Sequence, residues 1–246
     1  MSLEYWKVRA EGYERLEWAT RDEYLRVFVA AGHFQPGDRV LDVGTGSGIV
    51  AHAMAPLVSE VVGVDISPEM LELARASQAA NESFVEGDAR SLNFPDGCFD
   101  KVTARMAFHH LVEGGERAMR ECHRVLRPGG LMVFSEAVPP DPSLGDWFAR
   151  MFALKEERLV FFADDLVALM EAGGFAVERA ISHATPQVSI QNWLRNSGLP
   201  QGTQDRIVKM HLVDLGDEGR RHYNMTVADD GDIRCDFSYV TLAGRK

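Results

Sequence analysis

Short, almost wholly apolar runs recur through the first half of the chain, and helix-forming stretches separate them. Runs that predict buried strands end near Val43, Ile66, Arg105 and Glu136. Apolar strands that alternate with helices are typical of a mostly parallel sheet with helices packed on both faces. We therefore expect an α/β core over residues 36–138.

The pattern changes after residue 138, where several prolines interrupt the strand. Further on, helices are expected at 147–152 and 163–172, and strands at 175–181 and 233–242. The segment 186–232 between these strands is too long for a hairpin loop. We expect helices there and in 139–162, as lid insertions over an acceptor site.

An N-terminal helical cover is expected over residues 1–35, with a break near Ala19. Thr20 followed by Glu23 has the spacing of a capping box, and Gly32 is a typical helix end. No repeat or linker divides the chain, so we expect a single domain over residues 1–246.

The glycine-rich turn after the first strand is the most informative motif. Glycines at 44, 46 and 48 precede a predicted helix, as in the first half of a nucleotide-binding βαβ unit. Ile49 stands where a dinucleotide fingerprint needs a small residue. Asp42 would repel a pyrophosphate, yet it suits an ammonium group or a network that holds an amino-acid moiety. The turn therefore favours a phosphate-free, cationic nucleoside such as S-adenosylmethionine.

The next strand, residues 60–66, ends in Asp65, about twenty residues after the turn, where a carboxylate can accept hydrogen bonds from both ribose hydroxyls. Alternatively, Asp65 is only a second N-cap or a turn residue. Ser67 is a plausible N-cap for the following helix, with Pro68 at its first position.

These motifs resemble the class I S-adenosylmethionine-dependent methyltransferases, above all the group with the ubiquinone and menaquinone biosynthesis enzymes. The resemblance covers about residues 38–138, where four further motifs follow in order: 85–89, 94–100, 108–111 and 124–130. It implies a Rossmann-like, doubly wound, mostly parallel seven-stranded sheet with a C-terminal antiparallel strand. It also implies S-adenosylmethionine as the cofactor, with S-adenosylhomocysteine as its product.

The resemblance assigns cofactor contacts along this stretch. Asp88 is expected to bind the adenine amino group and the Ala89 N–H a ring nitrogen. Met70 either packs on the adenine face or only packs against the sheet, and Tyr13 either gates the site or only anchors the cover. The full set of expected cofactor-binding residues is Asp42, Gly44, Thr45, Gly46, Asp65, Ile66, Met70, Asp88, Ala89, Arg105 and Tyr13.

His109 and His110 are the candidate catalytic residues, because they follow a strand whose carboxyl end is expected to face the ligand. A histidine with an ordinary pKa of ~6.5 can accept a proton from a hydroxyl or an amine. Hydrogen bonding to the backbone is the alternative role. Adjacent histidines are poorly placed to share a metal ion, so no metal is expected.

The composition of the chain limits which partners and structural sites are expected. A formal charge of −11 disfavours nucleic acid, and three cysteines without C-x-x-C spacing disfavour a disulfide framework or a zinc site. No export signal or long apolar segment is visible, so we expect a cytoplasmic protein without membrane insertion. The oligomeric state, monomer or homodimer, stays open.

The predicted function is methyl transfer to an oxygen, nitrogen or carbon atom of a small-molecule acceptor. The apolar and aromatic residues of the lid insertions favour an aromatic or lipid-like acceptor. Two alternatives stay open: a nicotinamide-dependent oxidoreductase, which would share the fold and Asp65, and a non-catalytic protein that binds an adenosyl ligand.

Overall fold

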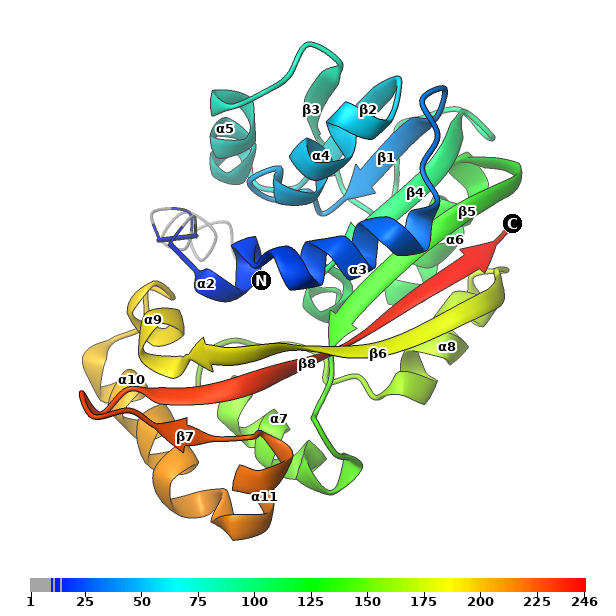
Figure 1. Ribbon diagram of the computed structural model, residues 1–246. Coiled ribbons are helices and arrows are strands. Elements are labelled where there is room, and N and C mark those ends of the chain that lie inside the picture. Colours follow the sequence, from blue (N-terminus) through cyan, green and yellow to red (C-terminus); the bar gives the residue numbers. More distant parts are fainter. Residues whose placement is uncertain (1–9, 11, 14) are drawn as a thin grey trace.

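A computed structural model describes residue 10, residues 12–13 and residues 15–246. Within these residues one sheet has eight strands: β1 (Arg39–Val43), β2 (Glu60–Asp65), β3 (Glu82–Glu86), β4 (Phe99–Arg105), β5 (Leu126–Ala137), β6 (Ala176–Ser189), β7 (Thr226–Val227) and β8 (Ile233–Arg245). Their order is β3-β2-β1-β4-β5-β8-β6, and β7 pairs with β8 (Figure 1). β8 runs antiparallel to its neighbours, whereas β1 to β5 pair in parallel. The predicted sheet is confirmed, and β7 adds an eighth, short strand.

Helices cover both faces of the sheet: α3 (Asp22–Gly32), α4 (Ile49–Met54) and α5 (Pro68–Ala76) on one, α6 (Gly115–Val125) and α8 (Ala163–Ala172) on the other. Successive residues of a strand point to opposite faces. Val40 of β1 accordingly packs with Phe28 and Leu71, and Leu41 packs with Met119 and Leu166. Each apolar strand thus supplies two separate core layers.

The predicted start of α5 is confirmed. The Ser67 hydroxyl accepts a hydrogen bond from the Met70 N–H at 3.3 Å, and Pro68 is the first helical residue. This cap satisfies one of the N–H groups that a helix start leaves without a partner. It holds the β2–α5 connection, where Asp65 lies, in a defined conformation.

The N-terminal cover breaks one residue later than its capping-box pattern indicates. Thr20 ends α2 (Glu17–Thr20), and its hydroxyl bonds back to the Glu17 carbonyl oxygen at 3.5 Å. Arg21, with ψ at 124°, is the extended residue before α3, so Thr20 does not cap that helix. The capping-box prediction was wrong because Thr20 belongs to the preceding turn of helix. The parts of the cover expected at residues 1–9, 11 and 14 lie outside the described residues.

The lid insertions contain the expected helices. They are α7 (Gly145–Ala153), α9 (Ile190–Arg195), α10 (Gln201–Lys209) and α11 (Gly216–His222), with a π-helical turn at Met210–Asp214. Strand β6 occupies residues 186–189, so the helices of the second insertion begin only at Ile190. In Figure 1, α9 to α11 and β7 lie around the far ends of the long strands β6 and β8. These strands therefore carry the lid away from the parallel half of the sheet.

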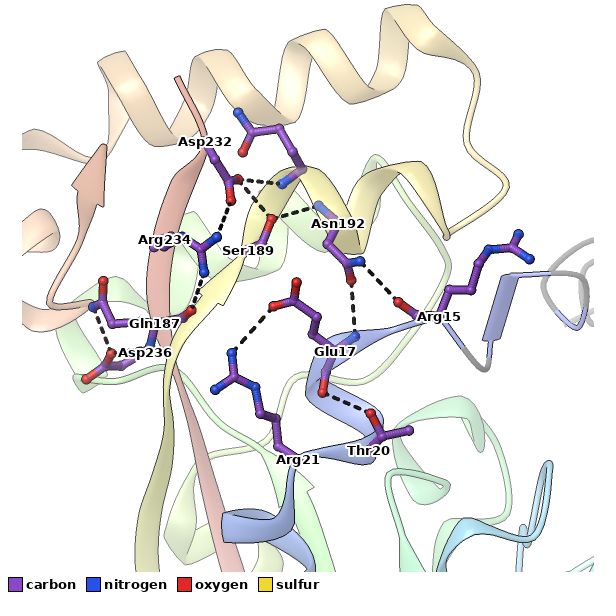
Figure 2. Close-up of polar contacts among 11 residues, drawn as sticks. Arg15, Glu17, Thr20, Arg21, Gln187, Ser189, Asn192, Asp232, Arg234 and Asp236 are labelled. Carbon is purple, nitrogen blue, oxygen red and sulfur yellow. Dashed lines mark hydrogen bonds and ion pairs between the residues drawn. The ribbon is translucent and has the colours of Figure 1, made fainter. Parts of the chain in front are cut away.

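The cover and the lid are joined by polar contacts (Figure 2). The Glu17 N–H donates to Asn192 Oδ1 at 3.1 Å, and Asn192 Nδ2 donates to the Arg15 carbonyl oxygen at 3.1 Å. Ser189 caps α9 and also donates to Asp232 Oδ1 at 2.9 Å. Arg15 and Glu17 of the cover are thereby fixed to α9, far away in sequence. Among the described residues, no helix has the length and apolarity needed to cross a lipid bilayer.

Candidate active site

A cavity lies at the carboxyl ends of β1 to β4. The segments that follow these strands contribute Gly44, Asp65, Asp88 and Met106 to its lining. Strand β1 lies between β2 and β4, so the chain reverses its direction of winding at this point. Open α/β sheets bind ligands outside such a switch point. The fold therefore places the candidate motifs of the sequence at the position where this architecture holds its ligand.

The structure brings all of the candidate site residues together, in this cavity and a smaller one that shares Tyr13, Gly44 and Arg105 with it. The larger cavity is lined by Tyr13, Gly44, Gly46, Asp65, Ile66, Met70, Asp88, Ala89, Arg105, His109 and His110. The smaller one is lined by Asp42 and Thr45 as well. Their individual roles toward a ligand stay predictions.

The glycine turn requires glycine for backbone and steric reasons. Gly44 and Gly46 have φ values of 68° and 55°, in the left-handed region. A Cβ on Gly44 would lie 2.5 Å from the Ala107 Cβ. The Gly46 N–H donates to Asp65 Oδ2 at 2.8 Å, which fixes the turn to the end of β2.

Both carboxylate oxygens of Asp65 accept backbone hydrogen bonds, Oδ2 from the Gly46 N–H and Oδ1, at 2.9 Å, from the Ser67 N–H. Asp65 therefore stabilises the turn, which is the alternative role considered for it. It also lines the cavity. Burial raises the pKa of Asp65 above its ordinary value. Each carboxylate oxygen has a second lone pair, so the hydroxyls of a ribose can still be accepted.

Asp42 is almost completely buried, with 1% of its surface exposed. Thr45 Oγ1 donates to one of its oxygens and Thr103 Oγ1 to the other, each at 2.7 Å. Burial raises the pKa of Asp42 to about 6 despite these bonds. The side chain thus lies in a hydroxyl network behind the turn.

Asp88 has a partner that the sequence analysis missed. Arg90 donates from its guanidinium to both carboxylate oxygens of Asp88, at 2.8–3.1 Å. These bonds lower the pKa of Asp88. An adenine amino group would have to share the carboxylate with Arg90, which also lines the cavity. Arg90 is only two residues from Asp88, a spacing that could have revealed the pair.

Arg105 is the last residue of β4, and its side chain contacts the N-terminal cover. Its Nη2 donates to the Ala19 carbonyl oxygen at 2.9 Å, and its guanidinium lies 4.2 Å from the centre of the Tyr24 ring. Tyr13 packs edge-on against Trp18 at 6.4 Å, and both rings line the cavity. The cover thus supplies part of the lining, and Arg105 holds the cover in place.

His109 forms a buried dyad with Glu136, at the end of β5. His109 Nδ1 lies 2.6 Å from Glu136 Oε2, and Glu136 Oε1 accepts the backbone N–H groups of Phe108 and His109. Burial raises the pKa of Glu136 to about 7. The partner of His109 Nδ1 is therefore a side-chain carboxylate, not the backbone. Glu136 was missed, although an acid at the end of a predicted strand was a usable signal.

The far end of the cavity contains a buried charged cluster. The ligand-type atoms of His109, His110 and Glu156 all lie within 4.8 Å of one another. Lys155 Nζ lies 2.6 Å from Glu156 Oε2, and an Arg158 nitrogen lies 3.6 Å from Glu156 Oε1. No local sequence pattern indicated this third ligand-type group beside the histidines. Two cations already share its carboxylate, and their charges oppose a further cation.

Aromatic rings complete this end of the cavity. They come from three distant parts of the chain: Phe152 at the end of α7, Trp193 in α9 and Phe237 in β8. The rings contact one another in a row, with centroids 5.7 Å and 6.0 Å apart. No local spacing connects these residues in the sequence, so only the fold shows that they form one surface.

The doubly wound sheet, the glycine turn after β1 and the acidic residue at the end of β2 define a Rossmann-like α/β fold. The sequence profile of a methyltransferase domain matches residues 41–134. The uncharacterized methyltransferase YcgJ of Bacillus subtilis is 30% identical over 229 residues, which are 90% of this chain and 89% of that protein. This chain belongs to the class I S-adenosylmethionine-dependent methyltransferases.

Two further similarities agree with this assignment. The crystal structure of YcgJ superposes with a TM-score of 0.80 at 28% identity and covers 92% of this chain and 99% of that one. The demethylmenaquinone methyltransferase of Symbiobacterium thermophilum is 40% identical over 127 residues, about half of each protein. The similarity to YcgJ thus extends through the lid, whereas the similarity to the menaquinone enzyme covers a shorter stretch.

Proposed function

We propose that this methyltransferase acts on a small, aromatic or lipid-like acceptor, with His109 as the general base. The observation that supports this proposal most directly is the His109–Glu136 dyad, because His109 lines a cavity that is also lined by the expected adenosyl-binding residues and by aromatic rings. The two ends differ in chemistry. One offers hydrogen-bonding groups at strand ends, and the other offers aromatic rings and buried charges.

The donor end fits S-adenosylmethionine, which supplies an activated methyl group when bound. Asp65 can accept hydrogen bonds from ribose hydroxyls, and Asp88 with the Ala89 N–H can bind the adenine edge. Ile66 and Met70 line the cavity beside them and can pack on the adenine. Arg105 is a buried cation that suits the carboxylate of the methionine moiety.

The dyad determines which nitrogen of His109 is basic. When the Nδ1–H is donated to Glu136, the neutral imidazole keeps its basic lone pair on Nε2. That atom can accept the proton that an acceptor hydroxyl or amine loses as it is methylated. Glu136 is a positioning residue, because it orients the ring and stabilises the imidazolium that forms.

The first test is a screen of metabolite extracts with methyl-labelled S-adenosylmethionine and mass spectrometry of the labelled products. Once an acceptor is identified, we expect His109→Ala to lower its turnover by about 100-fold or more, because general-base catalysis typically contributes a factor of this size. The affinity for S-adenosylhomocysteine, measured by calorimetry, should change by less than about threefold. His222→Ala, at a part-exposed histidine of α11, is the matched control.

The Glu136→Gln variant separates positioning from a merely structural role. We expect a lower turnover with an unchanged acceptor KM and a shifted pH profile of turnover, because the amide no longer stabilises the imidazolium. Unchanged turnover in His109→Ala would contradict the general-base assignment. Failure of the wild-type protein to bind S-adenosylhomocysteine would contradict the proposal as a whole.

A further inference from the structure

Buried polar atoms without partners lie where the N-terminal cover meets the end of β4. Trp18 Nε1 and Arg105 Nε are both buried, and neither has a hydrogen-bond partner among the described residues. The two residues are only 4% and 9% exposed. A buried donor that makes no hydrogen bond carries the full cost of its lost hydration, so native proteins rarely keep one without a reason. Binding of a ligand is such a reason.

The two donors are neighbours in the lining of the larger cavity. The guanidinium carbon of Arg105 lies 5.8 Å from the centre of the Trp18 ring, and both side chains line that cavity. Arg105 Nη2 donates to the Ala19 carbonyl oxygen, whereas Arg105 Nε has no such bond within the described part of the chain. Trp18 and Arg105 therefore offer a ligand two N–H groups and one positive charge.

The smaller cavity places opposite charges beside the glycine turn. It shares Gly44 and Arg105 with the larger cavity and is also lined by Asp42 and Ser47. The Ser47 hydroxyl, in a residue that is 6% exposed, is a third buried group for which the described residues provide no partner. Asp42 and Arg105 are close enough for the arginine to lower the pKa of the acid. A zwitterionic group, such as an amino-acid moiety, would find a counter-charge for each of its ends here.

The position of Trp18 is fixed before any ligand binds. Trp18 lies in the short helix α2, and the residues on both sides of it are bonded to other parts of the chain. The Glu17 N–H donates to Asn192 Oδ1 at 3.1 Å, and the Ala19 carbonyl oxygen accepts from Arg105 at 2.9 Å. A donor that is already held in place loses little conformational freedom when it binds a ligand.

We propose that the indole N–H of Trp18, together with Arg105 Nε, binds the carboxylate of the cofactor's methionine moiety. The proposed function, on which this inference rests, gives Arg105 that partner. Trp18 is the further cofactor-binding residue, supplied by the cover and not by the sheet. A carboxylate can accept from both donors, and hydrogen bonds to a charged group are the stronger ones. The N–H of Trp18 contributes this recognition in addition to the packing of its ring.

The test compares two ligands that differ only in the carboxylate. They are S-adenosylhomocysteine and its decarboxylated analogue, in which a hydrogen atom replaces the carboxylate. Each is titrated calorimetrically into the full-length protein. Trp18→Phe keeps an aromatic ring but removes the N–H. We expect its affinity for S-adenosylhomocysteine to fall about tenfold, the effect of one hydrogen bond to a charged group, and its affinity for the analogue to change less than about twofold.

Trp147→Phe is the matched control. Trp147 Nε1 is also buried and without a partner among the described residues, but Trp147 lines neither cavity. We therefore expect both affinities of this variant to equal those of the wild type. A selective loss of affinity for S-adenosylhomocysteine in Trp147→Phe as well would contradict the assignment to Trp18.

Nuclear magnetic resonance of the isotope-labelled wild-type protein gives a readout that needs no altered residue. The chain has four tryptophans, so the indole N–H signals are few. A hydrogen bond to a carboxylate deshields the donated proton. We expect the indole proton of Trp18 to move to higher frequency with S-adenosylhomocysteine and to move much less with the decarboxylated analogue. The indole signal of Trp147 should respond to neither ligand.

Equal losses of affinity for both ligands in Trp18→Phe would show that Trp18 only packs, and would overturn the inference. Equal responses of the Trp18 indole proton to the two ligands would overturn it too. The same holds if the wild type binds both ligands with one affinity, because the carboxylate is then not recognised. A wild-type protein that binds neither ligand would contradict the proposed function instead.

Discussion

The two ends of the cavity are built in different ways. At the donor end, each group follows a strand of the parallel sheet: Gly44 after β1, Asp65 at the end of β2 and Asp88 after β3. At the acceptor end, Lys155 comes from a connection between helices and Trp193 from a helix between β6 and β8. The donor end is thus part of the sheet, whereas the acceptor end is assembled from insertions around it.

This difference has a functional consequence. Groups fixed at strand ends keep their positions because the sheet determines them, whereas the lid can change its residues without disturbing the sheet. Changes at the donor end should therefore affect cofactor binding with every acceptor. Changes at the acceptor end should affect only the acceptor.

The largest expected effect is at the donor end. Asp65→Ala removes both the predicted ribose contact and the acceptor of the Gly46 N–H, so affinity for S-adenosylhomocysteine should fall about 100-fold. Calorimetric titration measures this change. Asp146→Ala, at an exposed carboxylate of α7, is the control. An affinity within threefold of the wild type would show that the sheet edge does not determine cofactor binding.

Gly44→Ala tests the turn itself. The left-handed φ and the 2.5 Å approach to Ala107 should cost about 2 kcal/mol, which lowers the melting temperature by several degrees. Thermal unfolding checks this. Gly202→Ala, in α10, where an added Cβ meets nothing within 4 Å, should leave stability equal or higher. Equal melting temperatures of Gly44→Ala and the wild type would contradict the strain assigned to the turn.

A smaller effect is expected at the acceptor end. Phe237→Leu keeps an apolar side chain but removes the aromatic contact with Trp193, so the acceptor KM should rise about three- to tenfold. The affinity for S-adenosylhomocysteine should stay within twofold. Val227→Ala, at an exposed residue of β7, is the control. An equal loss of cofactor affinity in Phe237→Leu would contradict the separation of the two ends.

The smallest expected effect is a pH dependence of stability caused by Asp42, which lies behind the glycine turn. The unfolded chain releases the proton of Asp42 near its ordinary pKa of 3.8, whereas the folded protein retains it to about pH 6. The stability that Asp42 contributes is therefore complete below pH 3.8 and is lost as the pH rises to about 6. The side chain in the Asp42→Asn variant stays neutral in the folded and the unfolded state. The melting temperature of the variant minus that of the wild type should therefore increase as the pH rises from 3.8 to about 6.

Asp42 experiences other charges, chiefly those of Arg105 and Asp65, which both proteins retain. Thermal unfolding at several pH values measures the difference between them. The variant is compared with the wild type at each pH. A difference that stays constant across this window would show that the raised pKa of Asp42 does not affect stability.

Local sequence was sufficient where a residue's structure depends on its close neighbours. Ser67 caps α5 as expected, because an N-cap bond spans only three residues. Thr20 has an equally good capping pattern, yet it ends α2 because Asn192 fixes the neighbouring Glu17 N–H from another part of the chain. The length of β6 was likewise underestimated, since pairing with β8 continues to Ser189.

The sequence by itself determined the donor end: a glycine turn and acidic residues at strand ends, within the core of a class I methyltransferase. It did so because short motifs at the ends of parallel strands meet at one sheet edge wherever the sheet forms. Only the tertiary structure decided the acceptor end. The Glu136–His109 dyad, the Lys155–Glu156–Arg158 cluster and the aromatic row join residues far apart in the chain, and their contacts follow from packing, which no local spacing encodes.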